Sequence, residues 1–312
     1  MSSSLKVMKF GGTSVGAADR LRHLVEIVRT AAEETRVVVV ASALSGITNE
    51  LAAAWDAAGT AEFDPDGLCL ALRDRHRSLA SEILAPDGVA AYEGPMSALL
   101  DELRVLLCRI ETEGTKPAFR DWLLSIGERI SVPLVALALV EAGLESESYE
   151  ATDLIRTDGT FGEAVVDLNF TYRQVRRWHR RVSVAAVPVV TGFIGATADG
   201  EITTLGRGGS DYSAALVASA LKASVLERWT DVDGIYTDDP HKNPNAKRYA
   251  AIVLEEAWAW NQAGKLGMHK RALDPLVVAG VPVHVRSTVE PDHPGTLILP
   301  AGHEEFHFAV NQ

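Results

Sequence analysis

Apolar residues follow two patterns along the first forty positions of the chain: short continuous runs and one longer stretch with helical spacing. Residues 5–10 and the four consecutive valines within 36–41 have the form of buried strands. Residues 17–32, between them, repeat apolar positions with the period of a helix. The order strand, helix, strand predicts one βαβ unit.

Beyond this unit the two patterns continue to alternate. Residues 48–143 are mainly helical in pattern, with breaks at proline and glycine near 65–67, 86–88 and 94–95. The remaining expected elements are strands at 184–190, 224–229 and 281–285, half of a hairpin at 201–204, and helices at 210–222, 252–262 and 267–279. This alternation predicts an α/β fold with a mainly parallel sheet, in which ligands bind at the carboxyl ends of strands. The glycine-rich segments fall at those ends.

Composition narrows the class of protein and its partners. The 312 residues are 47% hydrophobic and 23% charged, which is typical of a soluble globular protein. The net charge of −12 argues against nucleic acid or an anionic membrane as a partner, and it means that an anionic substrate needs local cations. With two distant cysteines, Cys69 and Cys108, we expect neither a disulfide framework nor a zinc site. Because we find no signal-peptide pattern and no apolar stretch long enough to span a bilayer, we expect a cytoplasmic protein.

The first candidate site follows the strand at 5–10 and includes Lys9, Gly11, Gly12 and Thr13. Glycines allow backbone amides to approach a phosphate closely, and Lys9 adds a mobile positive charge beside them. The segment matches neither the dinucleotide pattern nor the Walker A pattern, and a tight turn is the alternative interpretation.

Two further segments suit an amino-acid substrate. In 42–49, small hydroxyl residues such as Ser42 and Thr48 surround a glycine and are able to bind a carboxylate. The alternative is a strand-to-helix turn with a capping hydroxyl. In 125–129, Glu128 follows a glycine and is suited to a substrate ammonium, although a solvated pair on a helix is the plainer interpretation.

The two longest motifs lie in the last third of the chain. In 203–211, three glycines surround Arg207 at the predicted start of a helix. The helix N-terminus, the free amides and the guanidinium all favour a bound anion, which makes a flexible loop the weaker interpretation. In 229–240, four aspartates, a glycine and a tyrosine are able to frame a nucleotide base and ribose, or to form two β-turns.

In this order the five segments resemble aspartate kinases of the amino acid kinase family, from about Lys6 to Ile298. The strings G-R-G-G-S-D and W-T-D-V-D-G-I-Y-T are the most specific. The resemblance implies a three-layer αβα sandwich around an eight-stranded, mainly parallel sheet. It implies a single catalytic domain over residues 1–300, in which about 1–200 bind the amino acid and about 201–300 bind the nucleotide. A short tail at 301–312 and no ACT regulatory domains are expected.

The implied activity is phosphorylation of the side-chain carboxylate of L-aspartate by ATP and Mg²⁺, in a homodimer. This is the first step toward lysine, threonine and methionine. The nucleophile has a reference pKa near ~4 and is ionised at pH 7, so no general base is needed. Catalysis then depends on positioning and on neutralising the charge of two anions.

The resemblance also assigns roles to single residues of this sequence. Lys9, Arg207 and Asp211 are the implied catalytic residues, with Asp211 orienting lysines, and no protein side chain is implied as a metal ligand. Aspartate is held by Ser42, Thr48, Glu128, Arg207 and Ser210. ATP is held by Lys9, Gly11, Gly12, Thr13, Gly208, Gly209, Thr230, Asp231, Tyr236 and Lys265.

Two positions depart from the family pattern in the nucleotide-binding part. His241 stands where the family has an arginine that helps to bind ATP, and Leu266 stands where the family has a lysine that reaches the phosphates. Lys265 or Lys270 is the candidate for supplying the missing charge. The alternatives for function are a kinase for another acidic amino acid and a pseudokinase that only binds nucleotide or amino acid.

Overall fold

Eight strands form one central sheet in the computed structural model, which describes residues 4–58, 63–238, 242–243 and 245–301. The strands are β1 (Leu5–Phe10), β2 (Arg36–Ala41), β3 (Ser146–Tyr149), β4 (Val187–Thr191), β7 (Val225–Thr230), β8 (Ala251–Val253), β9 (Val283–Ser287) and β10 (Thr296–Leu299). Their order is β3-β4-β2-β1-β7-β9-β10-β8, and neighbours are parallel except β9 and β10. The expected eight-stranded, mainly parallel sheet is confirmed. The expected hairpin is confirmed as β5 (Ile194–Ala196) and β6 (Ile202–Thr204).

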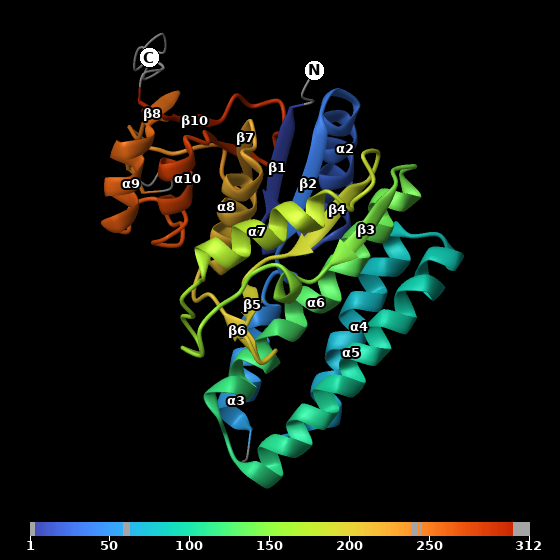
Figure 1. Ribbon diagram of the computed structural model, residues 1–312. Coiled ribbons are helices and arrows are strands. Elements are labelled where there is room, and N and C mark those ends of the chain that lie inside the picture. The colour runs from blue at the N-terminus through green and yellow to red at the C-terminus, as the bar shows by residue number, and fades with distance from the viewer. Residues whose placement is uncertain (1–3, 59–62, 239–241, 244, 302–312) are drawn as a thin grey trace.

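Helices cover both faces of this sheet (Figure 1). On one face α2 (Ala18–Glu34) packs against α6 (Pro117–Glu141), and on the other α8 (Gly209–Leu221) packs against α7 (Leu168–His179) and α10 (Asp274–Ala279). The other helices are α1 (Gly12–Val15), α3 (Ile47–Ala57), α4 (Pro65–Ile83), α5 (Pro86–Glu113), the 3₁₀ turn η1 (Ala151–Asp153) and α9 (Leu254–Gln262). The three-layer αβα sandwich is therefore confirmed.

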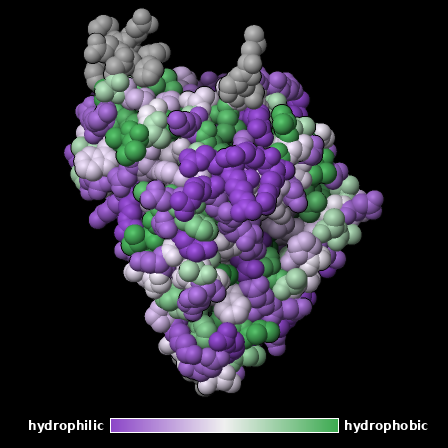
Figure 2. Space-filling model, in the orientation of Figure 1, coloured by the Kyte–Doolittle hydropathy of each residue, from purple (hydrophilic) through white to green (hydrophobic). Residues whose placement is uncertain are grey.

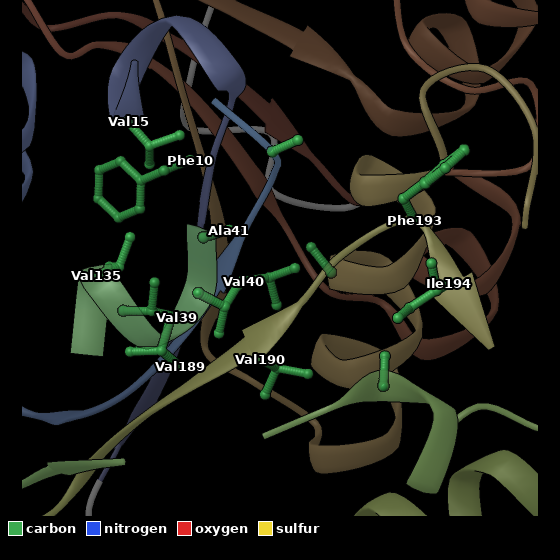
Figure 3. Packing of buried hydrophobic residues seen from close by; sticks show 14 of the residues in the cluster. Phe10, Val15, Val39, Val40, Ala41, Val135, Val189, Val190, Phe193 and Ile194 are labelled. Carbon is green, nitrogen blue, oxygen red and sulfur yellow. The ribbon is translucent and has the colours of Figure 1, made fainter. Parts of the chain in front are cut away.

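The central strands divide their valines between the two helical layers, because successive side chains of a strand point to opposite faces. Figure 3 shows Val39 directed toward Val135 of α6, whereas Val40 points to the opposite face of the sheet. Val40 is the register partner of Lys9 on β1, and Lys9 is in turn the partner of Arg228 on β7. Lys9 and Arg228 therefore share the face that α8 covers.

Several predicted boundaries were wrong. The expected break at residues 94–95 is absent, since α5 runs through Pro95 and buries both Tyr92 and Met96 around it. The helix expected at 267–279 begins at Asp274, because Gly264 and Gly267 have φ values of 76° and 60° that interrupt it. The strand expected at 281–285 is observed as β9 at Val283–Ser287, and a further strand, β10, follows it. Strands β3, β8 and β10, of four, three and four residues, were not predicted.

Helices α6 and α7 show opposite surface character. Helix α6 is the one described helix long and apolar enough to cross a membrane, so the expectation that no such stretch exists was wrong, but 78% of its apolar window is buried inside the protein. Helix α7, which was not predicted, buries Thr171 and Val175 and carries Arg176 and Arg177 in its last turn. Hydrophilic residues gather over it in Figure 2.

Candidate active site

Three charged side chains meet near the carboxyl ends of β1 and β7. Lys9 and Arg228 lie side by side on neighbouring strands, and Asp211 reaches them from the first turn of α8. The Nζ atom of Lys9 lies 2.7 Å from Oδ1 of Asp211, and Nε of Arg228 lies 3.4 Å from Oδ2. One carboxylate thus holds two cations in adjacent positions.

Asp211 is ionised in this arrangement. Its burial would raise the pKa of the carboxyl, but the charges and hydrogen bonds of Lys9 and Arg228 outweigh that effect and hold the pKa below its usual range. Asp211 is therefore suited to fixing two cations in place and not to accepting a proton.

Glu128 presents a second buried carboxylate, on α6. Its side chain is 3% exposed, and Oε2 has no hydrogen-bond partner among the described residues. Burial raises the pKa of Glu128 to about 8, while a hydrogen bond from the backbone of Ala43 and the charge of Lys9 oppose the rise only in part. A buried oxygen without a partner is costly unless a ligand satisfies it, and an ammonium group would do so.

Close backbone contacts fix the loops around Glu128 and Lys9. A Cβ on Gly12 would lie 2.9 Å from the carbonyl oxygen of Ala43, so the loops after β1 and β2 meet at a glycine. A Cβ on Gly127 would lie 2.9 Å from Cβ of Ala43, which brings α6 against the same loop. The hydroxyl of Ser131 donates to the carbonyl of Ser42 at 2.7 Å and ties α6 to the end of β2.

The glycine-rich segment before α8 forms the other side of the site. Gly206 and Gly208 have φ values of 86° and 78°, a backbone conformation that favours glycine. Ser210 packs against Gly192, where a Cβ would lie 2.6 Å from that of Ser210. Arg207 is exposed and forms no hydrogen bond or ion pair with any described residue, so its guanidinium is available beside the helix N-terminus.

A cleft of about 890 Å³ opens beside Arg228. Its walls include the predicted nucleotide residues Asp231, Tyr236 and Lys265, together with Leu266. Burial and the carboxylate of Asp233, which accepts hydrogen bonds from the Tyr236 hydroxyl at 2.9 and 2.7 Å, raise the pKa of Tyr236 to about 12. The volume is in the range of small-molecule sites.

Comparisons with known proteins identify a family to which a chain with this fold and site is similar. The sequence model described as the Amino acid kinase family matches residues 4–287. The chain belongs to the amino acid kinase family. It is 35% identical over 297 residues to lysine-sensitive aspartokinase 3 of Escherichia coli (strain K12), covering 95% of this chain and 64% of that protein. It is 29% identical to bifunctional aspartokinase/homoserine dehydrogenase 2 of Arabidopsis thaliana, covering 96% of this chain and 33% of that protein.

Solved structures agree with this assignment. The crystal structure of E. coli aspartokinase III in complex with aspartate and ADP matches this amino acid kinase with a TM-score of 0.86 at 33% identity, covering 96% of this chain and 65% of that one. The UMP kinase of Bacillus anthracis matches with a TM-score of 0.51 at 15% identity, which is a likeness of fold alone. The chain spans about one third to two thirds of the length of the curated relatives named above.

In this member of the family, the predicted site residues fall into three groups. Lys9, Glu128 and Asp211 come together through the ion pair and the charge effects described above. The second group belongs to the neighbouring loops and helix starts: Ser42 and Thr48 after β2, Arg207, Gly208, Gly209 and Ser210 at the start of α8, and Gly11, Gly12 and Thr13 after β1. The third group lines or adjoins the cleft: Thr230, Asp231, Tyr236 and Lys265. The roles of all these residues stay predictions.

The sequence interpretation missed three structural contributors. Arg228 pairs with Asp211, where lysines alone were expected. Asp121 on α6 accepts hydrogen bonds from the backbone of Thr204 at 2.7 Å and of Gly162 at 2.8 Å, and so anchors the segment that leads into α8. Trp260 lines the cleft. None of the three stands in one of the five motifs. His241, which directly follows the motif at 229–240, lies outside the described residues.

Proposed function

We propose that this chain transfers the γ-phosphoryl group of MgATP to the side-chain carboxylate of L-aspartate. The observation that carries the proposal is the buried carboxylate of Glu128 beside Lys9, whose Oε2 has no partner among the described residues, which suits a substrate with an ammonium group and further negative charge. The likeness to aspartokinases, one of them solved with aspartate and ADP, supports the same substrates.

In this proposal each end of aspartate meets a different group. Glu128 binds the ammonium, and Arg207 binds the α-carboxylate at the start of α8, where Ser210 assists. Ser42 and Thr48 offer hydroxyls from the loop after β2. Because the buried Glu128 binds the ammonium and the exposed Arg207 binds the α-carboxylate, the side-chain carboxylate of aspartate is left to face Lys9.

The nucleotide occupies the cleft in residues 201–300, with its base and ribose near Thr230, Asp231 and Tyr236. Its phosphates run toward Lys9 along Gly11, Gly12 and Thr13, opposite Gly208 and Gly209, with Lys265 at the rim. Among the described residues no cluster of three His, Cys, Asp or Glu side chains is suited to hold a metal ion. Mg²⁺ is therefore proposed to enter bound to the ATP phosphates.

The chemical step needs positioning more than acid–base catalysis. An oxygen of the aspartate side-chain carboxylate forms a bond to the γ-phosphorus, the bond from phosphorus to the β–γ bridging oxygen breaks, and ADP leaves with that electron pair. The products are 4-phospho-L-aspartate and ADP. Lys9, fixed by Asp211 at 2.7 Å, offsets the charge on the transferring group. We place this enzyme in the cytoplasm as a homodimer, and light scattering of the purified protein tests the dimer.

A coupled assay of ADP release tests the proposal, with L-aspartate, L-glutamate and N-acetylglutamate compared at equal concentration. We expect turnover with aspartate and trapping of its acyl phosphate by hydroxylamine as a hydroxamate. Glu128→Gln, which keeps the size of the side chain, is the matched comparison and should release ADP much more slowly at an aspartate concentration below its KM. Turnover with another acid but not with aspartate would reject the proposed substrate.

A further inference from the structure

The cleft and the Lys9–Asp211 pair share one residue, Arg228. It lines the cleft with Leu266 and Lys265, and its Nε atom lies 3.4 Å from Asp211. Its Nη2 atom lies 3.5 Å from the carbonyl oxygen of Gly267, so the guanidinium faces the segment in which Leu266 lies. Arg228 is thus the described cation that connects the nucleotide cleft to the proposed phosphoryl-transfer point.

The charges around Arg228 favour an anion. Lys9 and Arg228 are register partners on parallel strands, and like charges in such positions repel each other. Asp211 is the carboxylate paired with both cations, while Asp231, Asp233 and Asp238 add negative charge elsewhere along the cleft. The three side chains are 11%, 16% and 6% exposed, so water screens the surplus positive charge poorly. An anion bound beside Arg228 would remove this repulsion.

The two lysines near Leu266 are less well placed. Lys270 is exposed and does not line the cleft, and its carbonyl oxygen is held by the side chain of Gln262 at 2.9 Å. Lys265 lines the cleft but is exposed, and no hydrogen bond or ion pair to a described residue fixes its side chain. Arg228, in contrast, is held on a strand and by Asp211, and a guanidinium suits bidentate contact with phosphate oxygens.

We propose that Arg228 binds the phosphate groups of the nucleotide and supplies, from β7, the positive charge that the family resemblance places at position 266. This inference rests on the proposed function, because it names a further substrate-binding residue of the same site. Leu266 then forms an apolar wall of the cleft without a loss of phosphate affinity, since the cation has moved to the neighbouring strand.

Calorimetric binding of ADP and AMP to the full chain tests this proposal independently of turnover. Arg228→Leu should weaken ADP binding by roughly ten- to a hundredfold and AMP binding by less than about threefold, because AMP lacks the outer phosphates. Arg228→Lys should retain most of the affinity, and adding Leu266→Lys to Arg228→Leu should restore at least part of the loss. Arg286→Leu removes an arginine from the adjacent strand that does not line the cleft, and it should leave ADP binding unchanged.

Two results would overturn the role of Arg228. One is wild-type ADP affinity in Arg228→Leu. The other is an equal loss of ADP and AMP affinity in both Arg228→Leu and Arg228→Lys, which would mean that Arg228 only supports the local fold. Failure of the wild-type chain to phosphorylate aspartate, with the ADP-specific loss intact, would reject the proposed function and leave the phosphate role of Arg228 standing.

Discussion

The two halves of the site are built differently. Around Glu128, glycines are required by close approach, since a Cβ on Gly12 or Gly127 would lie 2.9 Å from the loop after β2. Around the cleft, Gly264 and Gly267 have no neighbour within 4 Å of a Cβ position and serve only their positive φ. The first half is a packed, buried socket, whereas the second half combines exposed side chains such as Asp231 and Lys265 with buried ones such as Leu266 and Val285.

This difference bears on which residues are free to change. In the socket, a side chain at Gly12 would meet the backbone of Ala43, and one at Gly127 would meet the side chain of Ala43. Along the cleft, Arg228 already presents a cation from the strand next to the loop that holds Leu266. The departure from the family pattern at Leu266 falls in the second half, and His241 lies outside the described residues. Strict recognition of the amino acid and a rearranged contact to the nucleotide are thus compatible in one chain.

The largest expected effect concerns the residue that joins the two halves. Lys9→Met should lower kcat by roughly a thousandfold or more, because the cation nearest the proposed transferring group is lost. The fold should remain, since Arg228 still pairs with Asp211. Lys6→Met is the matched control: Lys6 lies three residues earlier on β1, on the other face, where it pairs with Glu227 at 3.5 Å. Near-normal turnover of Lys9→Met would contradict the assigned role.

The next effect tests the socket through Glu128. Glu128→Gln should raise the KM for aspartate by about ten- to a hundredfold, because a charge-assisted contact to the ammonium is lost. The KM for ATP should change little, since Glu128 does not line the cleft. Steady-state kinetics with each substrate varied in turn measure both values. Equal changes in the two KM values would show that Glu128 affects the binding of both substrates.

The same carboxylate makes stability depend on pH. In the folded chain the pKa of Glu128 is raised from 4.5 to about 8, so the folded state binds one proton more than the unfolded state between these values. The free energy of unfolding should therefore fall as pH rises through this window, by roughly 3–5 kcal/mol at most. Glu128→Gln lacks this titration, so its Tm without ligands should exceed that of the wild type at pH 8. A lower Tm of Glu128→Gln at pH 8 would contradict the burial of an ionisable carboxyl with one unpartnered oxygen.

A smaller effect follows for aspartate binding. Below pH 8 the free protein holds Glu128 protonated, and binding of an ammonium requires that proton to leave. The KM for aspartate should fall by up to about tenfold per pH unit from pH 6.5 to 8 and then level off. Kinetics at constant ionic strength measure this slope. If Glu128→Gln keeps the same slope, another group is responsible.

The sequence predicted those parts of the molecule in which local pattern and tertiary environment agree. Strand β1 is rich in apolar residues and β2 contains four consecutive valines, and both were placed with their observed bounds. Lys9 and Asp211 stood out because glycines surround them. Strands β8 and β10 have three and four residues, too few for a period to be recognised.

The missed site residues depend on contacts between distant segments. Asp121 and Thr204 are 83 positions apart, and nothing near either residue indicates that they meet. Arg228 stands in a strand of mixed character, and its position beside Lys9 follows from the register of β1 and β7 and from the placement of α8. A charged residue within a strand has no local sequence pattern that marks it as a site residue, whereas a glycine-rich loop does.

The smallest expected effects concern Lys265 and Lys270, the two candidates for the charge that is missing at Leu266. Lys265→Ala should raise the KM for ATP by about threefold or less, because an exposed, unfixed cation contributes little in high dielectric. Lys270→Ala should change it less still, since Lys270 does not line the cleft. Both variants should be assayed beside Arg228→Leu under the same salt conditions, because screening weakens exposed charges most. If either alanine variant loses tenfold or more in kcat/KM for ATP while Arg228→Leu does not, the second phosphate cation is the lysine replaced in that variant, in the loop between α9 and α10. The cation would then not have moved to the strand, and the cleft would keep the charge near its expected position.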